Sequence, residues 1–82
     1  MKGDEQRTMK AEYKEILTKR QAQVYESIIS YQNKKGYAPT VRELCAMIGV
    51  SSTSTIALHL KKIEEMGFIK RQQNFPRAIS IL

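Results

Sequence analysis

The chain is 82 residues long, 41% of its residues are hydrophobic, and its formal net charge at pH 7 is +6. This length permits one small core, because a domain of about 60 residues buries only roughly 60% of its unfolded surface. No apolar run approaches the roughly 18 residues of a membrane span, and the charged start lacks the apolar segment of a signal peptide. We therefore expect a cytoplasmic protein without a membrane partner.

The first predicted element is an N-terminal arm over residues 1–16. Basic and acidic side chains cancel within residues 1–17, so the net charge of +6 lies in the rest of the chain. A neutral arm joined to a basic body is typical of a domain that binds a polyanion, although basic surfaces without ligands are common. Within the arm, Met9, Tyr13 and Ile16 have helical spacing, which predicts a short, weakly amphipathic helix.

A long helix is predicted to follow, from Thr18 to about Lys35. Thr18 and Gln21 have the spacing of a capping box, in which each residue hydrogen-bonds the backbone of the other. Apolar side chains then recur every three or four residues, which predicts one buried face. That face consists of Val24, Tyr25, Ile28 and Ile29. Gly36 supplies the left-handed residue that ends the helix.

A second, shorter helix is predicted between Thr40 and Gly49. Thr40 begins another capping box with Glu43, and Gly49 is a C-cap glycine. The inward stripe consists of Leu44 and Ile48 with Val41 and Cys45. Cys45 is the only cysteine in the chain and belongs to this apolar pattern, so we expect a buried, inert thiol.

The third predicted helix begins in the hydroxyl-rich segment Ser51–Thr55, whose residue types favour helix N-termini. Ile56, Leu60 and Ile63 recur at helical spacing and form its predicted buried face. Gly67 is its predicted C-cap. Only a few residues separate this helix from the second one. Two helices joined so closely are typical of the helix-turn-helix unit, whose second helix enters the major groove of DNA.

Beyond the third helix the apolar pattern changes to a twofold alternation. Residues 68–71 and 78–82 are rich in β-forming residues, and turn formers separate them, which predicts a two-stranded hairpin. Ile79 and Ile81 should face the helices and Ser80 the opposite side. Three helices followed by this wing predict a mainly α fold with a small β-hairpin, the winged helix-turn-helix.

Five segments are together far more specific than a generic helix-turn-helix: Leu17–Gln21, Gly36–Glu43, Gly49–Ser52, His59–Leu60 and Pro76–Leu82. With them, the domain over residues 17–82 resembles the N-terminal DNA-binding domain of LexA repressors, the SOS-response regulators of bacteria, and above all their Gram-positive branch. The resemblance implies a transcriptional regulator in the bacterial nucleoid that binds double-stranded DNA sequence-specifically. It would act as a repressor or a stand-alone competitor at inverted-repeat, SOS-type operators, where such domains pair weakly.

The resemblance also implies which side chains contact DNA, because in this family the third helix reads base edges and the wing reaches the minor groove. Base contacts are expected from Ser52, Ser54, Thr55, Ala57 and Leu58. Further contacts from the helices are expected from Arg42, Ser51, Lys61 and Lys62, and contacts from the wing from Arg71, Asn74, Phe75 and Arg77. Short hydroxyl side chains and free amides at a helix start suit bases and phosphates, and either wing arginine suits a phosphate or a narrow minor groove.

The sequence departs from the family at three of its positions. At Ala57 and Leu58 relatives often have polar side chains, whereas here only apolar contact, for instance with a thymine methyl group, is available. Two interpretations of Leu58 stay open: it contacts DNA, or it packs inward beside Leu60. Met66 stands where some relatives have a lysine, so one phosphate contact is expected to be missing.

A larger departure is that the self-cleaving, dimerising domain of LexA repressors has no counterpart after Leu82. We therefore expect neither self-cleavage nor the usual dimer contact. The chain is then a fragment or a stand-alone protein, and the arm, which the family usually lacks, favours the second interpretation.

Two other classes of function are alternatives to DNA binding. A protein-interaction module would use the third helix or the arm to bind a partner repressor or an RNA polymerase subunit, and the apolar pair Ala57 and Leu58 favours it. An enzyme is the weakest hypothesis, because the only histidine, His59, lies on a helix without a catalytic partner and no metal-ligand cluster is evident. We expect no cofactor and no small-molecule substrate.

Overall fold

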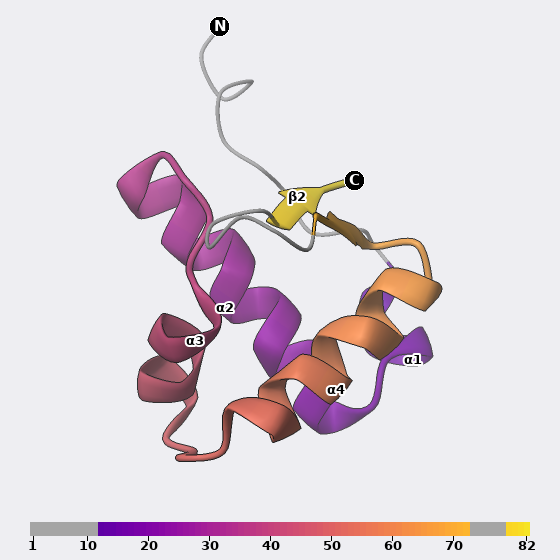
Figure 1. Ribbon diagram of the computed structural model, residues 1–82. Coiled ribbons are helices and arrows are strands. Elements are labelled where there is room, and N and C mark those ends of the chain that lie inside the picture. The colour runs from indigo at the N-terminus through magenta and orange to yellow at the C-terminus, as the bar shows by residue number, and fades with distance from the viewer. Residues whose placement is uncertain (1–11, 73–78) are drawn as a thin grey trace, which may run out of the picture.

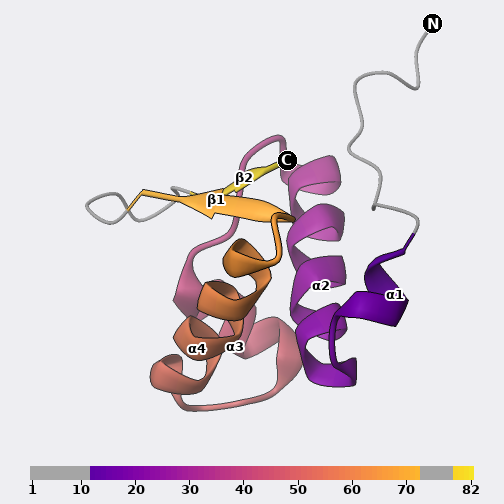
Figure 2. The same cartoon turned by 90° about the vertical axis from the view of Figure 1, so that its right-hand side faces the viewer.

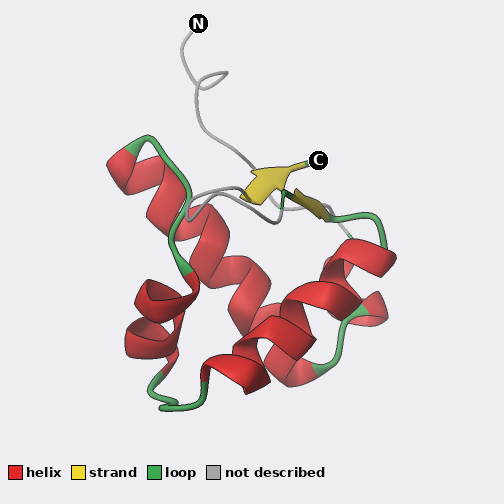
Figure 3. Ribbon diagram, in the orientation of Figure 1, coloured by secondary structure: helices red, strands yellow, loops and turns green. Residues whose placement is uncertain are grey.

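The computed structural model describes residues 12–72 and 79–82, which form four helices followed by a two-stranded sheet (Figure 1). The elements are α1 (Tyr13–Ile16), α2 (Lys19–Lys35), α3 (Val41–Ile48), α4 (Thr53–Glu65), β1 (Ile69–Arg71) and β2 (Ile79–Ile81). The three predicted helices are α2, α3 and α4, and the sheet lies over one end of α4 (Figure 2). The secondary structure drawn in Figure 3 confirms the winged helix-turn-helix architecture.

Both predicted capping boxes are present. At the start of α2, the Gln21 amide donates to Thr18 Oγ1 over 3.2 Å, and the Thr18 amide donates to Gln21 Oε1 over 3.0 Å. Thr40 and Glu43 make the same reciprocal pair at the start of α3. Each cap satisfies amides that the helix itself leaves unpaired, and its threonine contributes about 1 kcal/mol.

Glycines end these helices much as the sequence predicts. Gly36 follows α2 with φ +86° and Gly49 follows α3 with φ +88°, both in the left-handed region. The end of α4 differs slightly, because Met66 is its C-cap and the left-handed Gly67 comes one residue later. The Gly67 amide donates to the Glu64 carbonyl oxygen, so the glycine still turns the chain from α4 toward β1.

One core joins the helices and the sheet. Its buried side chains include the predicted stripes of α2 and α4, together with Leu44 of α3 and Ile69 of β1: Val24, Tyr25, Ile28, Ile29, Leu44, Ile56, Leu60, Ile63 and Ile69. Cys45 is also buried, as predicted, whereas Val41 and Ile48 of the same predicted stripe are only partly buried against this core. Burial of such side chains stabilises the fold by about 1.5–3 kcal/mol each relative to exposure.

The two strands pair antiparallel, with Lys70 opposite Ser80. Ile79 and Ile81 are buried and Ser80 is exposed, so the predicted two-sided alternation of the wing is confirmed. Among the described residues, no single helix is long and apolar enough to cross a bilayer. Only the α3 and α4 pair meets that test together, across a bend of 103°.

The N-terminal helix is shorter than the stripe in the arm suggests. α1 begins at Tyr13, and Met9 lies outside the described residues. Ile16 is 48% exposed, contrary to its predicted place on an apolar face. The reason is that the helix ends at Ile16 and the extended backbone of the next residue turns Leu17 into the core instead. Tyr13 is half-buried, with its ring centroid 5.3 Å from that of Tyr25.

Candidate nucleic-acid interface

The turn between α3 and α4 gives the geometry of a helix-turn-helix. The two helices bend by 103° across residues 49–52, within the roughly 90–120° of that motif. The Cys45 carbonyl oxygen accepts from the amides of Gly49 and Val50, and the Cys45 thiol lies 3.8 Å from the Ser52 carbonyl oxygen. These contacts fix the start of α4 relative to α3.

The outer face of α4 consists of the exposed side chains Ser54, Thr55, Leu58, Lys61, Lys62 and Glu65. The opposite face carries the buried stripe and packs on α2 and α3. Leu58 is 63% exposed, so the interpretation that it packs inward beside Leu60 is wrong. Two residues earlier Ile56 is fully buried, which leaves Leu58 on the far side of the helix. Ala57 lies at the flank and is half-buried.

The start of α4 presents short hydroxyl side chains to solvent. Ser51, Ser52, Ser54 and Thr55 are all exposed. Ser52 is the N-cap, and its Oγ accepts from the Thr55 amide over 3.3 Å. The remaining amides of the first turn carry the positive end of the helix dipole, which attracts phosphate or a base acceptor.

Two exposed cations, Lys61 and Lys62, lie on this face, and the predicted contact Arg42 is exposed in the first turn of α3. Lys62 Nζ lies 3.9 Å from Glu65 Oε1, and both side chains are more than half exposed. An exposed pair of this kind contributes little, so Lys62 can exchange it for a phosphate. Neither Arg42 nor Lys61 forms an ion pair with another described residue. All the predicted contacts from the helices are therefore exposed except the half-buried Ala57, and those of α4 other than Ala57 share its outer face or its first turn.

On β1, the predicted contact Arg71 also binds Glu64, which the sequence analysis did not predict. Arg71 Nε donates to Glu64 Oε1, and the Arg71 amide donates to Glu64 Oε2, each over 3.0 Å. Sequence reasoning missed Glu64, although its place seven residues before Arg71, across the Gly67 turn, was a usable signal. Asn74, Phe75 and Arg77, the other predicted wing contacts, lie outside the described residues.

These bonds should make part of the stability depend on pH. They lower the pKa of Glu64 below its ordinary value of 4.5, first through the Arg71 amide, then through its side chain, with a smaller effect of Lys70. The carboxylate therefore stabilises the fold fully above pH 4.5 and loses its effect as the pH falls below that value. Solvent reaches about a third of this side chain, which limits the gain to about 1 kcal/mol.

The measurement is urea unfolding of the wild type and of Glu64→Gln at pH 7 and pH 3. We expect the wild type to be more stable by up to about 1 kcal/mol at pH 7 and the difference to shrink toward zero at pH 3. An unchanged difference at both pH values would contradict the role assigned to the ionised carboxylate.

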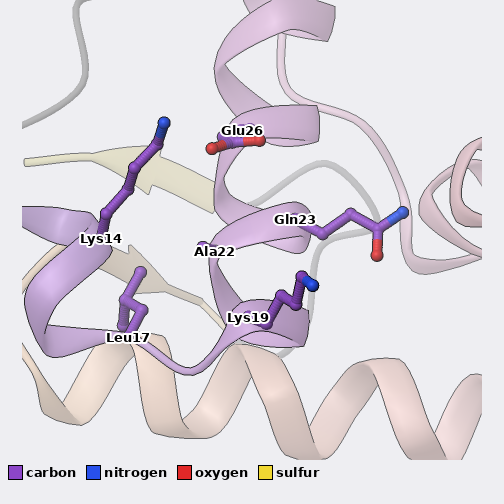
Figure 4. A pocket seen from close by; sticks show the side chains of 6 residues that line it. All are labelled: Lys14, Leu17, Lys19, Ala22, Gln23 and Glu26. Carbon is purple, nitrogen blue, oxygen red and sulfur yellow. The ribbon is translucent and has the colours of Figure 1, made fainter.

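A second surface feature lies between α1 and α2. It is a pocket of about 530 Å³ lined by Lys14, Leu17, Lys19, Ala22, Gln23 and Glu26, and its side chains come from both helices and their connection (Figure 4). At the same junction, the Tyr13 hydroxyl donates to Glu26 Oε2 over 2.5 Å, and this bond raises the pKa of Tyr13 to about 12. The bond joins α1 to α2. The described residues contain no cluster of three or more metal-ligating side chains.

Comparison with known proteins assigns the same segment. The family model described as LexA DNA binding domain matches residues 14–78. The chain is 47% identical to a LexA repressor of Staphylococcus haemolyticus over 66 residues, which make up 80% of this chain and 32% of that relative. It is 51% identical over 63 residues to one from Ligilactobacillus salivarius, covering 77% of this chain and 31% of the relative. The chain thus spans about a third of the length of these relatives.

Proposed function

This chain belongs to the LexA DNA-binding domain family, and from that premise we propose that it binds duplex DNA sequence-specifically and represses transcription where it binds. The observation that carries the proposal is the outer face of α4. Exposed hydroxyl groups occupy its first turns, exposed lysines follow, and α3 holds the helix at an angle of 103°. An α-helix that presents one exposed face in this way fits the major groove of B-form DNA.

The side chains divide into groups that read bases and groups that hold the backbone. Ser54 and Thr55 are short enough to approach base edges, and Leu58 offers apolar contact to a thymine methyl group. Lys61 and Lys62 lie about one turn or more further along α4 and would contact phosphates. On the wing, Asn74, Phe75 and Arg77 are proposed to reach the adjacent minor groove.

The target is proposed to be an inverted-repeat operator in the bacterial nucleoid, occupied by two copies of the domain. Helix-turn-helix domains bind half-sites that mirror their own twofold symmetry. Exposed hydroxyls, lysines and Arg42 suit such a polyanion, whereas nothing in the outer face of α4 suggests a reaction. We therefore propose a binding function without a catalytic step, a cofactor or a small-molecule substrate.

Backbone NMR during titration with duplex DNA tests the proposal. A pool of random duplexes is first used to select bound sequences, and the selected duplex is then added to the labelled protein. The largest shifts are expected in residues 51–66, with few in α1, which serves as the internal control. Signals of residues 51–66 that stay unmoved at saturating DNA would refute DNA binding by α4.

A protein-interaction module is the second candidate function. It is favoured by the exposure of Leu58 and Met66, at 63% and 50%, on and just after α4. Such a module would retain its partner at high salt, where DNA contacts through phosphates are lost. If the chain is such a module, selection from the pool of random duplexes should enrich no sequence.

A further inference from the structure

The carboxylate of Glu64 holds two parts of the molecule together. One oxygen accepts from the Arg71 amide and the other from Arg71 Nε, both over 3.0 Å. The side chains of Glu64 and Arg71 are only 33% and 28% exposed. The pair therefore differs from Lys62 and Glu65 on the same helix, which are 3.9 Å apart and more than half exposed.

The pair lies where it can fix the orientation of the wing relative to α4. Glu64 lies in the last turn of α4, and the left-handed Gly67 then reverses the chain into β1. Arg71 is the last residue of β1, and its partner Ile79 is the first residue of β2. The two hydrogen bonds therefore join the last turn of α4 to the last residue of β1.

We propose that Glu64 is a positioning residue that sets the angle of the wing against α4, with Arg71 bound to the protein and not to DNA. This inference rests on the proposed function, because its consequence is that α4 and the wing engage one duplex together. Two bonds to one carboxylate restrict rotation, which a single exposed ion pair would not do.

Charge alone predicts the opposite result for removal of Glu64. A carboxylate near DNA repels phosphates, so a neutral side chain should strengthen binding to every duplex. If Glu64 positions the wing, its replacement should instead weaken binding to the selected duplex, since wing and helix contacts no longer form at once. Glutamine is the suitable replacement, because its amide has a single acceptor oxygen and can keep only one of the two bonds.

The experiment measures affinity and its salt dependence for Glu64→Gln, Arg71→Gln and the double variant, with the selected duplex and with an unrelated duplex of equal length. Glu65→Gln is the matched control, because it removes the same charge from the next residue. Glu64→Gln should weaken binding to the selected duplex about fivefold and leave the unrelated duplex equal or tighter. Glu65→Gln should tighten both, because it removes a carboxylate beside Lys62 and leaves the Arg71 bonds intact. The double variant should resemble each single variant, because each of the three keeps at most one of the two bonds.

Hydrogen exchange of the Arg71 amide in the free protein provides a readout independent of DNA. Faster exchange in Glu64→Gln, but not in Glu65→Gln, is expected. The proposal is overturned if Glu64→Gln tightens binding as its neighbour does, or if Arg71→Gln lowers the salt slope by about 0.9, the mark of a lost phosphate contact. Absence of binding by the wild type would refute the proposed function instead, and amide exchange would still test the pair.

Discussion

Raising the salt concentration from about 50 mM to about 200 mM should weaken duplex binding by this domain about 100-fold, if about four side chains contact phosphates. Each contact releases counterions and contributes a slope of roughly 0.9 in log affinity against log salt. The four proposed contacts are Arg77, Arg42 on α3, and Lys61 and Lys62 on α4, of which the last three are exposed. Arg71 is left out because Glu64 already binds its guanidinium.

Single variants separate this effect from general charge. Lys61→Ala should reduce the slope by about 0.9 for every duplex sequence, because a phosphate contact carries no base information. Lys14→Ala is the matched control, since Lys14 is an exposed lysine on α1, beside the pocket between α1 and α2. It should leave the slope unchanged. Equal effects of the two variants would mean that net charge, and not the face of α4, determines binding.

Local signals in the sequence were sufficient for the helices. Thr18 and Thr40 each precede a glutamine or glutamate by three residues, and such boxes depend only on neighbours in the chain. The burial of Ile56 and Leu60 follows from helical spacing in the same way. The side chains of α4 that are proposed to contact DNA could be identified only through resemblance to a family. Hydroxyl residues at a helix start are not specific for DNA, because they are equally good cap formers.

Features that depend on contacts between different helices and strands were harder to predict. The orientation of Leu58 was open because its neighbour Leu60 is also apolar, and only the packing of α4 on α2 and α3 decides between them. The pair of Glu64 and Arg71 needs the left-handed turn at Gly67 and the length of β1 to bring the two side chains together. Periodicity within one element carries no information on such a contact.

Ile56→Ala should be among the most destabilising single substitutions, with a loss of about 2–5 kcal/mol in the free energy of unfolding. Ile56 belongs to α4, and its side chain is fully buried in the core, so truncation leaves a cavity there. Domains of this kind have total stabilities of roughly 5–15 kcal/mol, so the loss is a large fraction. Urea unfolding followed by circular dichroism measures it. A loss below about 1 kcal/mol would mean that this stripe of α4 is not the core.

Leu58→Ala on the same helix is the matched variant, and its effect should fall on binding instead of stability. Because Leu58 is 63% exposed, its truncation should change the free energy of unfolding by no more than about 0.5 kcal/mol. If Leu58 packs on a thymine methyl group, deoxyuridine at that position of the selected duplex should weaken wild-type binding about fourfold, as expected for one buried methyl group. Leu58→Ala should bind the two duplexes equally well. If replacement of each thymine by deoxyuridine leaves the affinity of the wild type unchanged, Leu58 has no part in base recognition. Its exposure would then favour a protein partner.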